Sequence, residues 1–254
     1  MRLFTVDAFT DTAFKGNPAA VCLLESRVHD EWMQSVAAEM NLSETAFLLG
    51  DSLRWFTPKV EVSLCGHATL ATAHVLYSTG LADGEVQFST ASGTLTVNRQ
   101  ADGMITMDFP AKEVTPTTVP PGLEKALGVT PVAVGKSNLD LLVEVDSEDT
   151  VRTLTPDIEA LTSVDARGVI ITARGTSVDF VSRFFAPRVG VPEDPVTGSA
   201  HCALAPYWSP RLNRTHLTAA QLSPRGGLIH ITYRGPRVTL AGHATTILTA
   251  TLHA

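Results

Sequence analysis

The 254-residue sequence has few cysteines, few aromatic residues and no cluster of positive charge. Its three cysteines, Cys22, Cys65 and Cys202, form no CxxC pair and have no zinc-like spacing, so we expect no disulfide framework. Lys and Arg are scattered along a chain of formal net charge −7, which argues against a nucleic-acid partner. No apolar run approaches the roughly 18 residues that cross a membrane, so we expect no membrane partner.

Cofactor motifs are also missing. The chain has no HxxxH pair, no Walker loop and no GxGxxG after a strand, so we expect neither a metal nor another cofactor. The N-terminus reads as a strand that soon meets Asp7, which is unlike a signal peptide. Together with the sparse cysteines, this predicts a soluble protein of the reducing cytoplasm.

Two stretches stand out from an otherwise ordinary globular composition of 44% hydrophobic and 18% charged residues. In Leu64–Thr69 and in Asp194–Ala200, an extended segment reaches a glycine, Gly66 or Gly198, and a mostly apolar helical run follows. The two glycines lie about half the chain length apart. This layout is typical of a duplicated domain with one such helix in each half.

The apolar composition of these two helices predicts the fold. A helix with so little polar surface is usually enclosed, as at the centre of a barrel of strands. We therefore expect an α+β fold of two pseudo-symmetric halves, each a β-barrel-like sheet around a central helix. A stretch rich in Pro and Thr, 110–121, separates the halves. We place them at 1–112 and 113–254, with a last strand that can pack back on the first half.

Ala241–Thr245 echoes the first of the two stretches but lies between strand-like runs with no helix after it. We interpret it as a turn between two strands. Smaller helices are expected at 29–40, 122–127 and 156–161.

The N-terminal ends of the two central helices are the expected functional positions. Their unpaired N–H groups and the positive end of the helix dipole favour a carboxylate or phosphate. His67 follows Gly66 directly, and Asp194 precedes Gly198 by four residues. Each can be an ordinary core, capping or turn residue. Two titratable groups at two such ends nevertheless indicate a functional site.

Glu44 is the third titratable candidate. It lies between an amphipathic helix and a run of apolar or small residues. The ordinary interpretation is a solvated glutamate at the start of a strand. Burial would instead raise the pKa of such a carboxyl group and suit it to general acid/base catalysis. Asn17 is most simply a turn residue, although its amide can reach a ligand.

Cys65 is a weaker candidate. A helix N-terminus lowers the pKa of a thiol, so Cys65 can be considered as a base. A racemase with two opposed thiols needs a second cysteine before Gly198, where this chain has Thr197, a poor base at neutral pH. We therefore disfavour a catalytic role for Cys65, and we expect Cys202 to be buried and inert.

At these residues the chain resembles the phenazine-biosynthesis-like (PhzF-type) isomerase family, within the diaminopimelate epimerase fold. The similarity extends over nearly the whole chain and rests on several motifs in a fixed order. They are Asp7-Ala8-Phe9, Gly16–Val21, Asn41–Phe47, Arg54–Pro58, Glu61-Val62, Cys65–Leu70, Glu193–Ala200 and Arg237–Gly242.

The resemblance implies two similar halves with a site between them. It implies that Glu44 is the proton-transferring carboxylate, with His67 and Asp194 beside it. Backbone N–H groups near three residues would hold the substrate carboxylate; these are Gly66, Gly198 and Ser199. We add Asn17 and Ser43 to the expected substrate-binding set.

The family's known reaction isomerises a dihydro-hydroxyanthranilate by moving a proton along a conjugated ring, without a cofactor. We therefore expect a homodimeric isomerase that moves a proton within a small carboxylate-bearing metabolite. Racemising relatives use paired cysteines, which this chain lacks. Ser223–Gly227 departs from the family pattern, so the substrate need not be a phenazine precursor. The alternative is a catalytically silent binding or regulatory protein on the same fold.

Overall fold

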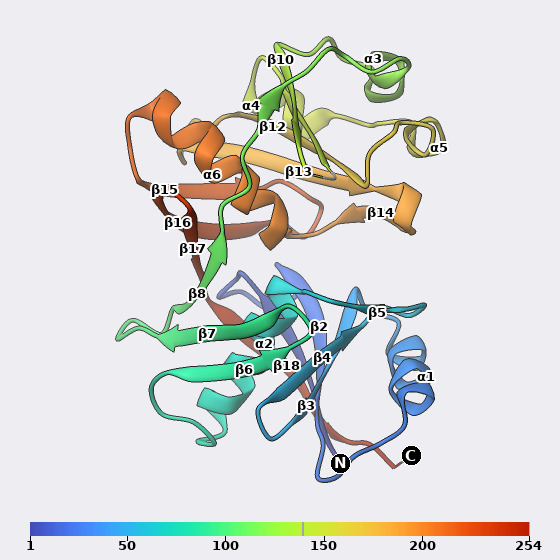
Figure 1. Ribbon diagram of the computed structural model, residues 1–254, viewed down its shortest axis with the longest axis vertical. Coiled ribbons are helices and arrows are strands. Elements are labelled where there is room, and N and C mark those ends of the chain that lie inside the picture. Colours follow the sequence, from blue (N-terminus) through green and yellow to red (C-terminus); the bar gives the residue numbers. More distant parts are fainter. Residues whose placement is uncertain (139, 254) are drawn as a thin grey trace. The chain divides into compact units, whose positions relative to one another are not determined.

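The computed structural model describes residues 1–138 and 140–253; Leu139 and Ala254, both in the expected second half, lie outside the described residues. The chain forms two compact units, shown in Figure 1. Unit 1 comprises Met1–Asp108 and Leu240–Ala254, and unit 2 comprises Phe109–Thr239. The expected second half, 113–254, thus differs from unit 2 at its C-terminal end. The last strand belongs to unit 1 because it pairs antiparallel with the first strand of the chain.

Unit 1 is built around a mixed sheet. Its strands are β1 (Arg2–Ala8), β2 (Asn17–Leu23), β3 (Glu44–Leu49), β4 (Ser52–Phe56), β5 (Glu61–Val62), β6 (Val86–Thr90), β7 (Gly93–Arg99), β8 (Ile105–Pro110) and β18 (Ala244–Thr251). β1 pairs antiparallel with β18 and with β2, and β2 runs parallel to β3. β3 and β4 are antiparallel, as are β6 and β7, whereas β4 and β6 are parallel. The strands therefore curve around one element.

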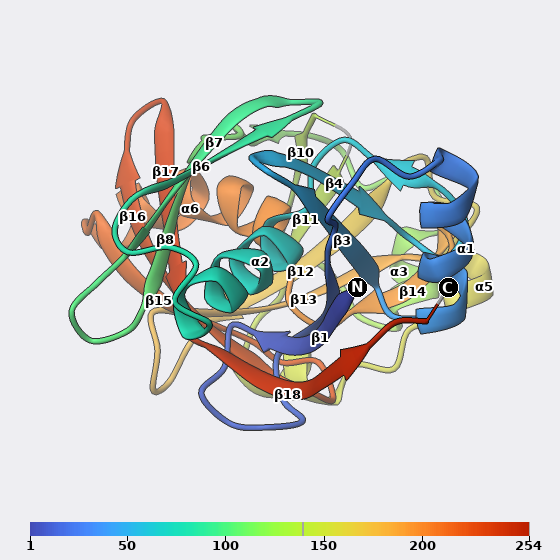
Figure 2. The ribbon, with the colours of Figure 1, turned by 90° about the horizontal axis from the view of Figure 1, so that it is seen from below.

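That element is α2 (Gly66–Ser78), which packs against β1, β2, β3 and β18 (Figure 2). Thr69 and Thr72 are buried in it, and their hydroxyl groups donate to the carbonyl oxygens of Cys65 and Ala68 at 2.6 and 2.8 Å. Polar side chains are tolerated inside the barrel because the helix itself satisfies them. α1 (Asp30–Met40) packs on β3 and β4 and contributes Met33 to a second apolar cluster.

Unit 2 repeats this construction. Its strands are β9 (Thr115–Pro116), β10 (Ala133–Ser137), β11 (Asp140–Glu144), β12 (Gly168–Arg174), β13 (Phe180–Ala186), β14 (Val191–Asp194), β15 (His216–Gln221) and β16 (Gly227–Arg234). β17 (Arg237–Gly242) leads back into unit 1. Its helices are α3 (Leu123–Leu127), α4 (Glu148–Thr153), α5 (Ile158–Leu161), a 3-10 turn η1 (Pro187–Val189) and α6 (Gly198–Leu212).

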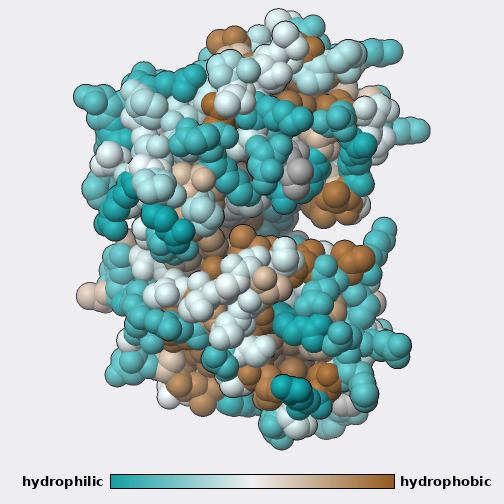
Figure 3. Space-filling model, viewed as in Figure 1, coloured by the Kyte–Doolittle hydropathy of each residue, from teal (hydrophilic) through white to brown (hydrophobic). Residues whose placement is uncertain are grey.

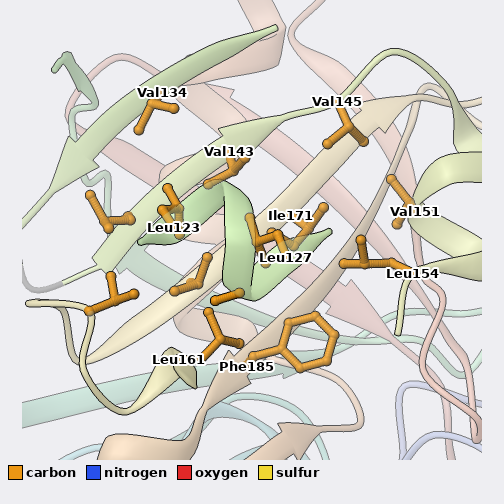
Figure 4. Close-up of a cluster of buried hydrophobic side chains, with 14 of the residues drawn as sticks. Leu123, Leu127, Val134, Val143, Val145, Val151, Leu154, Leu161, Ile171 and Phe185 are labelled. Carbon is orange, nitrogen blue, oxygen red and sulfur yellow. The ribbon is translucent and has the colours of Figure 1, made fainter. Parts of the chain in front are cut away.

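An apolar core fills the space between the small helices and the sheet of unit 2. Figure 4 shows Leu127 of α3 beside Ile171 of β12 and Phe185 of β13, all at most 1% exposed. On the face drawn in Figure 3, each unit carries mostly hydrophilic residues with scattered hydrophobic ones. Among the described residues, no helix is both long enough and apolar enough to cross a membrane.

The strand pairings show that the two units share one topology. The pairs β10–β11, β11–β12, β12–β13, β13–β15 and β15–β16 are antiparallel, parallel, antiparallel, parallel and antiparallel. The pairs β1–β2, β2–β3, β3–β4, β4–β6 and β6–β7 have the same order. A short strand, β5 or β14, precedes the central helix in each unit. The expected α+β fold with pseudo-symmetric halves is confirmed.

Three local features complete the comparison with the sequence. Ala241–Thr245 joins β17 to β18 through the single residue His243, so the stretch does connect two strands, but the expected turn is wrong. The sequence analysis missed α4, although Ser147 caps it by accepting a hydrogen bond from the Thr150 N–H. α6 continues through Pro206 and Pro210 to Leu212, well beyond the apolar run that predicted it. Packing inside the barrel outweighs the loss of two backbone donors.

Candidate functional site

The site in unit 1 is built on three chain segments that start side by side. β2 begins at Asn17 and β3 begins at Glu44, and the parallel register places Ala19 opposite Glu44. α2 begins at Gly66, after Cys65 in an extended conformation (φ −144°, ψ 106°). The first N–H groups of a helix have no partner within it. Two strand ends and one helix end therefore present an amide, a carboxylate and backbone donors together.

His67 connects these segments. Its Nε2 lies 3.2 Å from Glu44 Oε2, and its Nδ1 lies 3.2 Å from the amide nitrogen of Asn17. Asn17 is fully buried and His67 is 5% exposed, whereas the Glu44 side chain keeps 19% of its surface exposed. Of these three linked side chains, the Glu44 carboxylate is therefore the one that reaches solvent.

The protonation state of His67 follows from its surroundings. Burial lowers the pKa of His67 to about 3, so the imidazole is neutral at neutral pH. The Asn17 amide donates to Nδ1, which leaves the ring proton on Nε2, facing Glu44. His67 thus donates a hydrogen bond to the Glu44 carboxylate rather than pairing with it as a cation. Such a hydrogen bond fixes the orientation of the Glu44 carboxylate.

Cys65 completes this group. Its Sγ lies 3.5 Å from Nδ1 and 4.0 Å from Nε2 of His67, and the thiol is 6% exposed. One donor atom from each of Glu44, Cys65 and His67 falls within 4.8 Å of the others. The thiol, for which the sequence analysis disfavours a catalytic role, therefore lies beside His67, the imidazole that contacts Glu44.

The site in unit 2 surrounds the N-terminus of α6. Thr197 precedes α6 in an extended conformation (φ −112°, ψ 99°), and its hydroxyl donates to Asp194 Oδ2 at 2.5 Å. Gln221, which is fully buried, accepts from the Thr197 N–H at 2.8 Å. Its amide nitrogen donates to the Asp194 carbonyl at 2.6 Å and to the Thr197 hydroxyl at 3.2 Å. Gln221 thereby holds both ends of the turn that carries Asp194.

The Ser223–Gly227 stretch lies against the same turn. Ser223 Oγ donates to the carbonyl of Pro195 at 2.9 Å and accepts from the Gly226 N–H at 3.1 Å.

Sequence reasoning missed Gln221, but a signal existed. β15 alternates between inward and outward positions, and Gln221 takes an inward one after Leu217 and Ala219. A polar residue at an inward position needs buried partners.

Ser199 is held by an ion pair that the sequence analysis also missed. Arg167 donates to Ser199 Oγ at 3.3 Å and binds Asp140 through two hydrogen bonds, at 2.8 and 2.5 Å. The hydrogen bonds to Asp140 raise the pKa of Arg167, which keeps the guanidinium charged. Arg167 and Asp140 lie far apart in sequence and have no motif, so only the fold brings them to α6.

The repeated topology relates the two sets of residues. Asn17 begins β2 as Asp140 begins β11, and Glu44 begins β3 where Arg167 directly precedes β12. Ser199 is the second residue of α6, as His67 is of α2. In both units the residue at the start of the third strand, Glu44 or Arg167, contacts the second residue of the central helix. The contact is between a carboxylate and an imidazole in unit 1, and between a guanidinium and a hydroxyl group in unit 2.

The remaining expected residues have simpler surroundings. Ser43 is half-buried between α1 and β3, and Gly198 is buried as the first residue of α6. Cys202 is 4% exposed inside α6, as expected. Cys22 is buried in β2, and burial raises the pKa of its thiol to about 11. Cys22 therefore stays a thiol at neutral pH.

Comparison with known proteins gives full-length matches. The family model described as phenazine biosynthesis-like protein (PhzC-PhzF) matches residues 6–250. An uncharacterized isomerase of Pseudomonas aeruginosa is 51% identical, with 100% of this chain and 99% of the relative covered. An uncharacterized isomerase of Halalkalibacterium halodurans is 49% identical, over 98% of this chain and 97% of the relative.

Solved structures agree with this similarity. A phenazine biosynthesis protein of the PhzF family from Enterococcus faecalis superimposes with a TM-score of 0.94 at 44% identity, covering 99% of both chains. A probable proline racemase from Agrobacterium radiobacter superimposes with a TM-score of 0.69 at 10% identity, over 99% of this chain and 92% of that one. The second likeness extends to the fold alone.

Proposed function

The chain belongs to the phenazine biosynthesis-like (PhzC-PhzF) family and is an isomerase, and we propose that it moves a proton within a small carboxylate-bearing metabolite without a cofactor. The observation that carries the proposal is the Glu44 carboxylate held by a neutral, buried His67 at the N-terminus of α2. This is a general acid/base beside a set of anion-stabilising donors.

In the proposed reaction, the Glu44 carboxylate removes a proton from a carbon next to an activating group. The electron pair left on the substrate becomes enolate-like charge, which the first N–H groups of α2, near Gly66, stabilise. The resulting Glu44 carboxylic acid returns the proton to another carbon of the same molecule. Atoms and charge balance within one substrate, and no oxidant or reductant is consumed.

His67 and Asn17 would orient the carboxylate throughout this cycle. The Nε2 proton of His67 donates to Glu44, while the Asn17 amide fixes the imidazole tautomer. In unit 2, Asp194 stays a proposed catalytic residue, and Gly198 and Ser199 stay proposed binding residues. The hydrogen bonds of Asp194 with Thr197 and of Ser199 with Arg167 support well-fixed positions for both.

The test is isotope uptake. The wild-type protein and a Glu44→Gln variant are each incubated with a cell-free metabolite pool in deuterated water, and mass spectrometry detects metabolites that gain deuterium. We expect carboxylate-bearing metabolites to gain deuterium only with the wild type. If metabolites raise the melting temperature of the protein but none gains deuterium, the result would instead favour a catalytically silent binding protein.

A homodimer of this chain in the cytoplasm belongs to the same proposal. Light scattering should give twice the mass of the 27.1 kDa chain. A monomer mass at micromolar concentration would contradict the dimer.

A further inference from the structure

We propose that Glu44, Cys65 and His67 form a binding site for one thiophilic divalent cation, such as Zn²⁺ or Cd²⁺, that blocks the acid/base group. The three side chains offer one oxygen, one sulfur and one nitrogen donor within 4.8 Å of one another. Carboxylate, thiolate and imidazole are the ligands that zinc prefers in proteins. Blocking of turnover rests on the proposed function; binding of the cation does not.

The distances suit a tetrahedral ion. Zinc–ligand bonds of about 2.0–2.3 Å place neighbouring donor atoms about 3.3–3.8 Å apart. From His67 Nε2, Glu44 Oε2 lies at 3.2 Å and Cys65 Sγ at 4.0 Å. Sγ lies closer to Nδ1, at 3.5 Å, so the thiol and the imidazole must turn relative to each other before all three donors reach one ion. A water or a substrate oxygen would take the fourth position.

Binding of a cation rearranges the protons of the site. The neutral His67 imidazole offers one ring nitrogen to the ion. Its proton moves from Nε2 to Nδ1 when the ion binds, and the Asn17 amide turns its oxygen toward Nδ1. The Cys65 thiol loses one proton to solvent. Carboxylate and thiolate then neutralise the divalent charge in a largely buried place.

The positive end of α2 acts against a cation at this place. Binding must therefore depend on the two anionic ligands together, and removal of the thiol should abolish it rather than weaken it slightly. Asn17 supports His67 from behind, as second-shell residues do in metal sites, where their loss costs about 10–100-fold in affinity.

Unit 2 is an internal control. The equivalent positions there hold Arg167, Thr197 and Ser199, which offer a cation and two hydroxyl groups. This set cannot bind a thiophilic ion, so the expected stoichiometry is one ion per chain.

The experiment is a titration of the reduced, full-length protein with Cd²⁺, followed by the ultraviolet thiolate-to-cadmium charge-transfer band, and with Zn²⁺ by calorimetry. We expect one ion per chain, with the band absent in Cys65→Ala and affinity at least about 100-fold lower in His67→Gln. Cys22→Ala and Cys202→Ala, which remove buried thiols elsewhere, should bind like the wild type.

Circular dichroism is used to check that each variant is folded. Glu44→Gln removes the carboxylate ligand, and Glu44→Asp, which keeps a carboxylate, replaces it in the titration if Glu44→Gln does not fold. A charge-transfer band that survives in Cys65→Ala, or no band in the wild type at Cd²⁺ concentrations well above that of the protein, would overturn the proposal. If the protein binds the cation but introduces deuterium into no metabolite, the cation site stands and the proposed function alone is contradicted.

Discussion

Thr197 occupies at the start of α6 the position that Cys65 occupies at the start of α2. Both residues are extended and directly precede the first helical glycine, and both accept at their carbonyl oxygen from a side chain four residues later. The Thr197 hydroxyl donates to Asp194, whereas the Cys65 thiol contacts His67. Unit 2 thus has a hydroxyl group at the position where unit 1 has the Cys65 thiol, so we keep the carboxylates as the candidates for proton transfer.

Cys65→Ala should leave the rate of proton exchange within a few-fold of the wild type. The substitution preserves the backbone N–H groups of α2 and the contact between His67 and Glu44. A general base usually supplies about 10²–10⁴ in rate. Isotope exchange measured on the folded variant decides the matter, and a hundredfold loss would make Cys65 a catalytic base.

Two buried histidines should make the protein sensitive to acid. Burial lowers the pKa of His67 to about 3 and that of His201 to about 4. Below the ordinary histidine pKa of about 6.5 the unfolded chain binds protons that the folded chain refuses, so stability falls as the pH falls from about 6.5 toward 4. Each such histidine contributes up to about 1.4 kcal/mol per pH unit.

Urea unfolding at several pH values tests this. His67→Gln or His201→Gln should flatten the pH dependence over this range, whereas His253→Gln, at an exposed position, should not change it. A pH dependence unaltered by both core substitutions would show that these histidines are protonated in the folded protein.

Gln221→Met should destabilise unit 2. The side chain keeps its length but loses the acceptor for the Thr197 N–H and the donor to the Asp194 carbonyl. Each buried group left without a partner costs about 1–3 kcal/mol, so we expect a loss of about 2–5 kcal/mol in the free energy of unfolding. Gln100→Met, at an exposed position, is the matched control in the same urea titration. Equal effects of the two substitutions would contradict the role given to Gln221.

Gly16→Ala should disturb the segment that positions Asn17. Gly16 has φ +65°, and an added Cβ would lie 2.1 Å from the carbonyl oxygen of Ala8. Gly50 has a similar φ of +61° with nothing within 4 Å of its Cβ position, so Gly50→Ala measures the backbone strain alone. We expect Gly16→Ala to cost at least about 2 kcal/mol more than Gly50→Ala in thermal or urea unfolding. Similar costs would mean that the loop relaxes around the added methyl group.

The sequence predicted the parts of the site that lie next to local signals. Gly66, Gly198 and the apolar runs after them marked both central helices, and with them His67 and Asp194. The long-range contacts could not be predicted in this way. Asp140, Arg167 and Gln221 reach α6 only through the pairing of distant strands, and no local pattern encodes a register between them. The placement of Asn17 behind His67 likewise follows from the start of β2 beside β3.

The central claim is that Glu44 transfers the proton. Its most direct test is the rate at which wild-type protein, Glu44→Gln and Glu39→Gln introduce deuterium into the metabolite identified by isotope uptake. Glu39 is exposed on α1 and serves as the matched control. We predict that Glu39→Gln exchanges at the wild-type rate and that Glu44→Gln, folded by circular dichroism, loses at least about 10²-fold. Exchange by Glu44→Gln at the wild-type rate would contradict the account.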